Sequence, residues 1–241
     1  MKEKNIIAYS SSRVGSQGFL EDARTPIQSC LRAARKIIFI PYAGISIDRV
    51  SYTVRLKEAL PSLANYIEVI NAGNPREHLA SADAILVGGG NTFRLLQQLQ
   101  HHYLIEMIRE KINDGCPYIG WSAGSNILSP TICTTNDMPV IQPKNFRALD
   151  VYPFQINPHY YNLKPEGFNG ESRDDRLLEF LILNPLQKIV GLPEGSCLKL
   201  KGENLIVDGK DAVELSLGKD KMLEKKIILA GSTCNYLRFP A

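Results

Sequence analysis

Long apolar runs, clusters of one charge and metal-type cysteine patterns are all missing from this sequence of 241 residues. The apolar run nearest the N-terminus, Ile6 to Ala8, is far too short for a signal h-region or a membrane span. The 28 basic and 25 acidic residues leave a formal net charge of only +3, which does not favour a nucleic-acid partner. We therefore expect a protein that binds neither membranes nor nucleic acids.

Cysteine spacing gives no sign of a metal site or a disulfide framework. The count of five is odd, and without a signal-like segment this is typical of a reducing compartment. We therefore expect a cytoplasmic protein that holds no metal. The cysteines are Cys30, Cys116, Cys133, Cys197 and Cys234.

What the sequence does contain is an alternation of short apolar runs and helical patterns in its first half. Apolar residues make up 44% and charged residues 22% of the chain, as in ordinary globular proteins. The pattern predicts parallel strands buried on both faces, with ligands bound beyond their carboxyl ends. The expected strands are 5–9, 36–40, 67–71, 84–87 and 117–121, and the expected helices 18–35 (with a possible break at Pro26), 50–60, 75–81, 92–99 and 104–114.

The second half has a different character. Strands are expected at 149–156 and 189–192, with a helix at 173–183 between them. From 197 to 229 the pattern changes to short strands joined by glycine turns such as Asp208-Gly209, which predicts an antiparallel extension of the same sheet. We expect an α/β protein with one domain spanning residues 1–241.

The segment Gly120-Trp121-Ser122-Ala123-Gly124 fits the Gly-x-Ser-x-Gly pattern. An apolar strand enters it and a helical register leaves it, which is the context of a nucleophile elbow. The flanking positions are small, as so tight a turn requires. We interpret Ser122 as a catalytic nucleophile; the alternative is a close-packed turn whose serine only caps the helix.

Four histidines are available as a base for this serine. His78, His101 and His102 lie in polar helical segments and are expected at the surface. His159 instead follows a predicted strand and the rigid turn Asn157-Pro158, so it belongs at the edge where ligands bind. We interpret His159 as the general base; the alternative is a packed or capping histidine.

The segment Gly88-Gly89-Gly90-Asn91-Thr92 also ends a predicted strand and opens a helix. We expect the N–H groups of Gly90 and Ala123 to form an oxyanion hole. A phosphate cradle is the alternative. Phe93 stands where a dinucleotide fingerprint needs its last glycine, and no Walker lysine follows.

Together these segments resemble the peptidase E family of α-aspartyl dipeptidases. The resemblance implies the fold of the class I glutamine amidotransferase domain, with serine in place of cysteine. It also implies hydrolysis of dipeptides with an N-terminal aspartate, without metal or organic cofactor. We expect a monomer or homodimer. The resemblance runs in order over about residues 5–195, through the motifs Gly88 to Thr92, Gly120 to Asn126, Thr134 to Pro139, Asn157 to His159, Gly170 to Arg173 and Gly191 to Gly195.

The resemblance allows two carboxylates as the residue that orients His159. Asp137 lies in a loop, where an Asx turn would also explain it. Glu194 lies at the end of a predicted strand, where it could also be a solvated loop residue. We favour Glu194 for orienting the histidine and Asp137 for holding the substrate's amino group or shaping the pocket, and we keep both as catalytic residues.

An aspartyl substrate also needs a cation, and Arg173 follows Ser172, a predicted helix N-cap. A cation in the first turn opposes the helix dipole, which favours a functional role. The alternative is an ion pair with Glu171, Asp174 or Asp175. We assign Arg173 to substrate binding, together with Asn91 of the glycine-rich segment.

Two other functions remain possible on this sequence. The same scaffold could hydrolyse β-aspartyl peptides, as cyanophycinases do, or esters. A non-enzymatic module could instead use the glycine-rich strand ends to hold a phosphate or nucleotide. Comparing the hydrolysis of α-aspartyl, β-aspartyl and ester substrates distinguishes the first alternative from an α-aspartyl dipeptidase. A thermal shift with nucleotides tests the second alternative.

Overall fold

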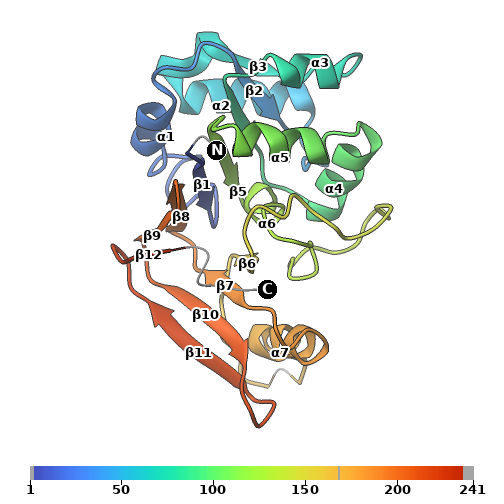
Figure 1. The fold of residues 1–241 in the computed structure, drawn as a ribbon, viewed down its shortest axis with the longest axis vertical. Coiled ribbons are helices and arrows are strands. Elements are labelled where there is room, and N and C mark those ends of the chain that lie inside the picture. Colours follow the sequence, from blue (N-terminus) through green and yellow to red (C-terminus); the bar gives the residue numbers. More distant parts are fainter. Residues whose placement is uncertain (1–2, 168, 236–241) are drawn as a thin grey trace.

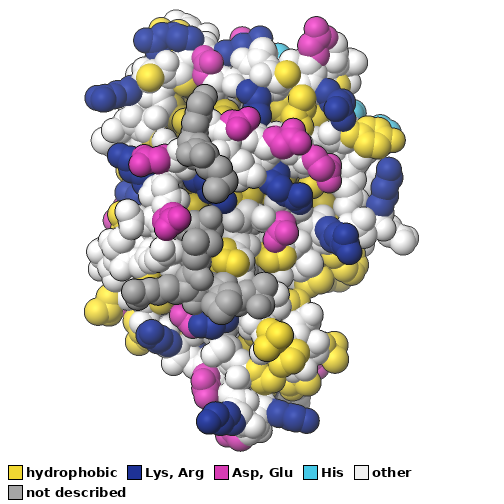
Figure 2. Space-filling model, in the orientation of Figure 1, with side chains coloured by type: hydrophobic (Ala, Val, Ile, Leu, Met, Phe, Trp, Pro, Cys, Tyr) yellow, Lys and Arg dark blue, Asp and Glu magenta, His cyan; other side chains and the backbone are white. Residues whose placement is uncertain are grey.

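The computed structural model describes residues 3–167 and 169–235, which form two sheets with flanking helices (Figure 1). The larger sheet has eight strands in the order β12-β9-β8-β1-β5-β4-β2-β3, and the smaller has four in the order β11-β10-β7-β6. Figure 2 shows both signs of charge interspersed over one face, as the small net charge suggests. The predicted α/β class is confirmed.

Five parallel strands form one side of the larger sheet, out to its edge at β3, and antiparallel strands continue the sheet on the other side. The four residues of β2 and the four of β4 are all buried, as expected for strands covered on both faces. The parallel strands are β1 (Asn5–Tyr9), β2 (Ile37–Ile40), β3 (Ile67–Val69), β4 (Ala84–Val87) and β5 (Tyr118–Trp121). The antiparallel strands are β8 (Ser196–Lys201), β9 (Asn204–Gly209) and β12 (Thr233–Asn235).

Helices cover both faces of this sheet and bury two separate apolar clusters against it. One face carries α1 (Arg24–Leu31) and α2 (Arg49–Ala59), followed by the 3-10 helix η1 (Pro61–Tyr66). The other carries α3 (Pro75–Ala80), α4 (Thr92–His101) and α5 (Ile105–Asn113).

Helix α1 is shorter than predicted, and Pro26 lies within its first turn, where proline is tolerated. In the described part of the chain, no helix has the length and apolar character needed to cross a bilayer.

The smaller sheet corrects one prediction. Strands β10 (Ala212–Leu217) and β11 (Leu223–Ile228) do not extend the larger sheet but pair with β6 (Gln155–Pro158) and β7 (Ile189–Leu192). Helix α7 (Arg173–Leu183) packs on this sheet, and both lie below the larger sheet in Figure 1. An alternating apolar pattern predicts that a segment is a strand, but it does not specify the partner.

The chain crosses between the sheets at two glycine turns that touch each other. Gly195 precedes β8 and Gly209 ends β9, both at positive φ. A Cβ on Gly209 would lie 2.0 Å from the Gly195 carbonyl oxygen, so these backbones approach as only glycine allows. The two sheets therefore meet beside Glu194.

Candidate active site

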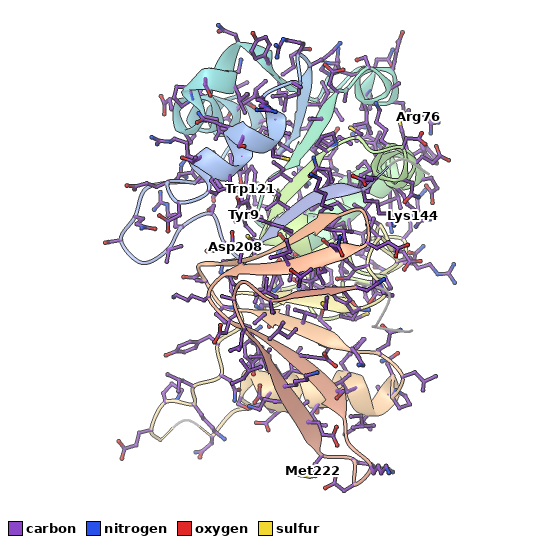
Figure 3. All side chains as sticks on the ribbon, turned by 60° about the vertical axis from the view of Figure 1, so that its left-hand side comes forward. Tyr9, Arg76, Trp121, Lys144, Asp208 and Met222 are labelled. Atoms are coloured by element: carbon purple, nitrogen blue, oxygen red, sulfur yellow. The ribbon has the colours of Figure 1, made fainter. Side chains whose placement is uncertain are left out.

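Ser122 lies in a strained turn between β5 and the one-turn helix α6 (Ala123–Asn126). Its φ of 55° and ψ of −113° fall in a region that L-residues rarely adopt. Its N–H donates to the carbonyl of Tyr9 at 3.1 Å, which joins the turn to the end of β1. Figure 3 shows Tyr9 close to Trp121, the residue before the serine.

The glycines around Ser122 are required by close backbone contacts. A Cβ on Gly120 would lie 2.2 Å from the Gly124 carbonyl oxygen, and one on Gly124 would lie 2.2 Å from that of Val87. Both atoms are backbone, so neither can yield without moving α6 or β4. The small residues of the Gly-x-Ser-x-Gly pattern thus have a physical cause in this fold.

We expect Gly124→Ala to lower the free energy of unfolding by at least about 2 kcal/mol, because the methyl group would displace β4. Chemical denaturation measures this change. Gly73→Ala is the matched control, since its Cβ would meet only the side chain of Asn71 at 3.5 Å, and we expect a shift within about 0.5 kcal/mol. Equal stability of the two variants would contradict the tight-turn interpretation.

The structure brings Ser122, His159 and Glu194 into one hydrogen-bonded row. The His159 Nε2 lies 2.8 Å from the Ser122 Oγ, and its Nδ1 lies 2.7 Å from the Glu194 Oε1. His159 directly follows β6, and Glu194 lies two residues after β7. Because β6 and β7 are parallel neighbours, their carboxyl ends present both side chains to the serine of the larger sheet. A nucleophile, a base and an orienting carboxylate in this order can support acyl transfer.

Ser10 holds the histidine backbone, and the sequence analysis did not find it. His159 has a positive φ of 53°, and its N–H donates to the Ser10 Oγ at 2.9 Å. That hydroxyl donates to the Leu192 carbonyl at 2.7 Å, and Ser10 is fully buried. Ser10 thus joins the end of β1 to both strands that carry the site. Its place directly after a predicted strand was the available signal.

Asp137 lies beside this row but bonds to a different element. Its Oδ2 accepts from the Thr92 N–H at 2.7 Å and from the Thr92 hydroxyl at 2.6 Å, at the start of α4. The Thr135 hydroxyl donates to the same oxygen at 3.2 Å. A small cavity of about 20 Å³ is lined by Asp137, Ser122 and His159. Of the two candidate carboxylates, the structure brings Glu194 to the histidine, while Asp137 caps α4 nearby.

The two N–H groups assigned to the oxyanion hole belong to Gly90, in the turn between β4 and α4, and to Ala123, the first residue of α6. Neither Gly90 nor Ala123 donates its N–H within the described residues. Gly90 has a φ of 137°, and a Cβ there would lie 2.3 Å from the Ala43 carbonyl oxygen, so the residue must be glycine. Two unpaired donors beside the serine are what an oxyanion hole requires.

Asn91 also borders the site, but contacts within the fold engage both ends of its amide. Its Oδ1 accepts from the Arg94 N–H at 3.0 Å as the N-cap of α4. Its Nδ2 donates to the Met138 carbonyl at 2.8 Å, which fastens the loop that carries Asp137. In this structure Asn91 therefore shapes the site through the backbone around it.

A groove of about 580 Å³ opens in front of the row and provides room for a small peptide. Besides Ser122, His159 and Glu194, its lining includes two arginines and three large aromatic side chains. These are Arg13, Arg55, Phe19, Tyr52 and Trp121.

Arg173 lines a different cavity, of about 200 Å³, with Lys164 and Arg176. The structure does not bring it into the groove that contains Ser122. Its half-buried guanidinium has a lowered pKa, because burial and then the charge of Arg176 disfavour another cation. Its three cationic side chains make this cavity suited to an anion. Its lining includes Tyr161, which lies two residues after His159 in the chain.

The acidic neighbours of Arg173 have other partners. Glu171 lies 3.6 Å from Arg176, and Asp175 forms a capping box with Ser172. Asp174 accepts from the Tyr160 hydroxyl at 2.6 Å and from the Asn162 amide at 2.7 Å, and it also pairs with Lys225. Among the described residues, the ion pair that would explain Arg173 structurally is not formed.

The other three histidines take no part in the groove that contains Ser122. His78 lies 2.8 Å from Glu68, and His102 stacks on Tyr42. His101 is exposed, and all three lie outside the groove. Within residues 3–167 and 169–235, no group of three or more metal-ligating side chains is present.

Comparison with known proteins places the chain among peptidases. Peptidase family S51 matches residues 6–207. The peptidase E of Shewanella oneidensis is 44% identical over 234 residues, which cover 97% of this chain and 98% of that protein. The peptidase E of Haemophilus influenzae is 46% identical over 201 residues, covering 82% and 92%. A solved structure from Listeria monocytogenes matches with a TM-score of 0.62 at 26% identity, covering 86% of this chain and 98% of that one.

Proposed function

This chain belongs to peptidase family S51 and is a serine peptidase, and we propose that it hydrolyses dipeptides with an N-terminal aspartate. The membership confirms the resemblance found in the sequence motifs. The observation that carries the proposal is the row Ser122–His159–Glu194 beside a groove of peptide size. Relatives named peptidase E match almost the full length of the chain, which supports an aspartyl dipeptide as substrate.

In the proposed reaction, the Ser122 hydroxyl attacks the carbonyl carbon after the aspartate, and His159 Nε2 takes its proton. The N–H groups of Gly90 and Ala123 stabilise the oxyanion. When the C–N bond breaks, His159 returns the proton to the leaving amine. Water, deprotonated by His159, then cleaves the acyl-enzyme and restores the serine.

Glu194 supports this step through the histidine. Its hydrogen bond to Nδ1 fixes the tautomer that leaves Nε2 free to accept the serine proton, and its charge stabilises the imidazolium. Asp137 is proposed to shape the amino-group side of the site, because it borders the cavity shared with Ser122 and His159. Asn91 is proposed to act in substrate binding by holding this loop in place.

Arg173 is proposed to bind the aspartyl carboxylate. It is a half-buried cation without an ion-pair partner among the described residues, and its cavity adjoins the segment after His159. A guanidinium can hold a carboxylate through two parallel hydrogen bonds.

The chain is proposed to work as one catalytic domain, because Ser122 comes from the larger sheet and His159 and Glu194 from the smaller. Neither sheet contains the whole row. We propose the cytoplasm as its location, and the free thiols of Cys30, Cys116, Cys133 and Cys197 fit a reducing compartment.

A substrate panel tests the proposal. We expect wild type to cleave Asp-Leu with a kcat/KM at least about 100-fold above that for Asn-Leu, Leu-Leu and β-Asp-Leu, because each of these lacks or displaces the recognised carboxylate. Arg173→Ala should reduce the Asp-Leu over Asn-Leu ratio by at least about tenfold. Arg49→Ala removes an arginine that lines neither the cavity of Arg173 nor the groove, so it is the matched control and should change the ratio little.

The panel distinguishes a failure of the aspartate assignment from a failure of the role assigned to Arg173. Turnover of another dipeptide but not of Asp-Leu would remove the aspartate assignment. An unchanged ratio in Arg173→Ala would instead remove only the assigned role of that arginine.

A further inference from the structure

Two arginines line the same groove as Ser122 and have no acidic partner among the described residues. Arg13 and Arg55 both line it, and neither forms an ion pair with a described residue. The carboxylate of the groove row, Glu194, is occupied by His159. The groove therefore presents uncompensated positive charge close to the serine.

Packing fixes Arg55 relative to the nucleophile. Its guanidinium carbon lies 4.6 Å from the centroid of the Phe19 ring, and that ring stands edge-on to Trp121 at 5.9 Å. Trp121 precedes Ser122 and donates its indole N–H to the Tyr52 hydroxyl at 2.9 Å. Tyr52 and Arg55 are three residues apart on α2, so they share a helix face. The face that carries Arg55 is thus tied directly to the serine turn.

The chemistry of a dipeptide supplies a ligand for this cation. In Asp-Xaa the α-carboxylate of the leaving residue lies three bonds from the carbonyl carbon that Ser122 would attack. It is a fixed negative charge, while a longer peptide has a neutral amide at that position. Arg173 lines a separate cavity, so the two carboxylates of the substrate have two separate cationic sites available.

We propose that Arg55, assisted by Arg13, binds the C-terminal carboxylate of the leaving residue and so limits the enzyme to dipeptides. This proposal rests on the proposed function, because it assigns the second carboxylate of the same substrate. Arg55 acts here as a specificity-determining residue. It takes no part in proton transfer.

The test compares Asp-Leu with its C-terminal amide, which removes the charge and keeps the side chain. Wild type should favour the acid by at least about tenfold in kcat/KM, chiefly through KM, as expected for a hydrogen bond between charged groups. Arg55→Met should bring the ratio below about threefold by raising KM for the acid, with the amide little changed. Arg55→Lys should retain part of the preference because it keeps the charge.

Arg49 offers a matched control on the same helix. It stacks on Tyr42 at 4.7 Å and donates to the Gln98 side chain at 3.2 Å, but it does not line the groove. Arg49→Met removes an equivalent arginine from α2, so its acid-to-amide ratio should stay at the wild-type value.

The results also separate this proposal from the aspartate assignment. Equal turnover of acid and amide by wild type, or equal losses on both in Arg55→Met, would overturn the subsite. A loss of the Asp-Leu over Asn-Leu preference in Arg55→Met would also overturn it, because Arg55 would then bind the side-chain carboxylate. If only a non-aspartyl dipeptide is cleaved, with the acid preferred and that preference lost in Arg55→Met, the subsite stands and the aspartate assignment fails.

Discussion

Ser122→Ala is expected to lower kcat for Asp-Leu by at least about 10³-fold while the protein stays folded. The hydroxyl is the atom that would form the acyl-enzyme, and His159 lies 2.8 Å from it, ready to take its proton. Without it, only the oxyanion hole and substrate binding remain to assist attack by water. Steady-state kinetics measure the loss, and a turnover within tenfold of wild type would exclude Ser122 as the nucleophile.

Stability measurements on variants of Ser122 distinguish a loss of catalysis from a loss of folded protein. Alanine adopts the Ser122 backbone conformation with the same strain, so the free energy of unfolding should change little. Ser122→Gly should raise it by about 1 kcal/mol, because glycine adopts a φ of 55° and a ψ of −113° without strain. If Ser122→Ala were strongly destabilised, its lost activity would be explained by unfolding and not by the missing hydroxyl.

Glu194→Gln is expected to lower kcat by about 10²-fold or more, because a neutral amide cannot stabilise the imidazolium and can fix the wrong tautomer. Asp137→Asn should lower kcat by less than about tenfold, since Asp137 contacts Thr92 and Thr135 and not His159. Its main effect should be on stability, through the start of α4. For both variants, kcat is measured with Asp-Leu and the free energy of unfolding is measured in urea.

The reverse ranking would contradict the row of hydrogen bonds that runs from Ser122 through His159 to Glu194. If Asp137→Asn lost more activity than Glu194→Gln, Asp137 would have to reach His159 in the reacting enzyme. Glu194→Asp provides a check on reach: it keeps the charge but shortens the side chain, so its loss should be smaller than that of Glu194→Gln.

The local features of the site were predictable from the sequence because they depend on neighbours in the chain. A serine between small residues, entered by a strand and left by a helix, indicates a tight turn whatever the partner elements are. The glycines at Gly88 to Gly90 and the strand end before His159 follow the same logic. The family resemblance added the substrate, which spacing alone did not indicate.

The choice between Asp137 and Glu194 depends on the three-dimensional structure, because it is set by how β6 and β7 pair. The pairing puts Glu194 beside the histidine, while α4 holds Asp137 at its first turn. The second sheet was missed for a related reason. The turns at Gly195 and Gly209 carry the chain from one sheet to the other, and their residues look like ordinary hairpin turns.

Two further residues illustrate the same limit. Ser10 looked like one of three small polar residues after a strand, and only its contacts with His159 and Leu192 distinguish it. Arg55 lies in the predicted helix 50–60 with no motif to mark it, and its position over Phe19 at the groove is seen only in the structure. Long-range contacts of this kind leave little trace in a single sequence.

Competition between water and hydroxylamine for the acyl-enzyme tests the central claim most directly. Asp-Leu, Asp-Ala and Asp-Phe share the aspartyl group and differ only in the leaving residue. If all three pass through the same aspartyl ester on Ser122, each must give the same ratio of aspartyl hydroxamate to aspartate at a given hydroxylamine concentration. A ratio that changes with the leaving residue would contradict a common acyl-enzyme, and with it the role assigned to Ser122.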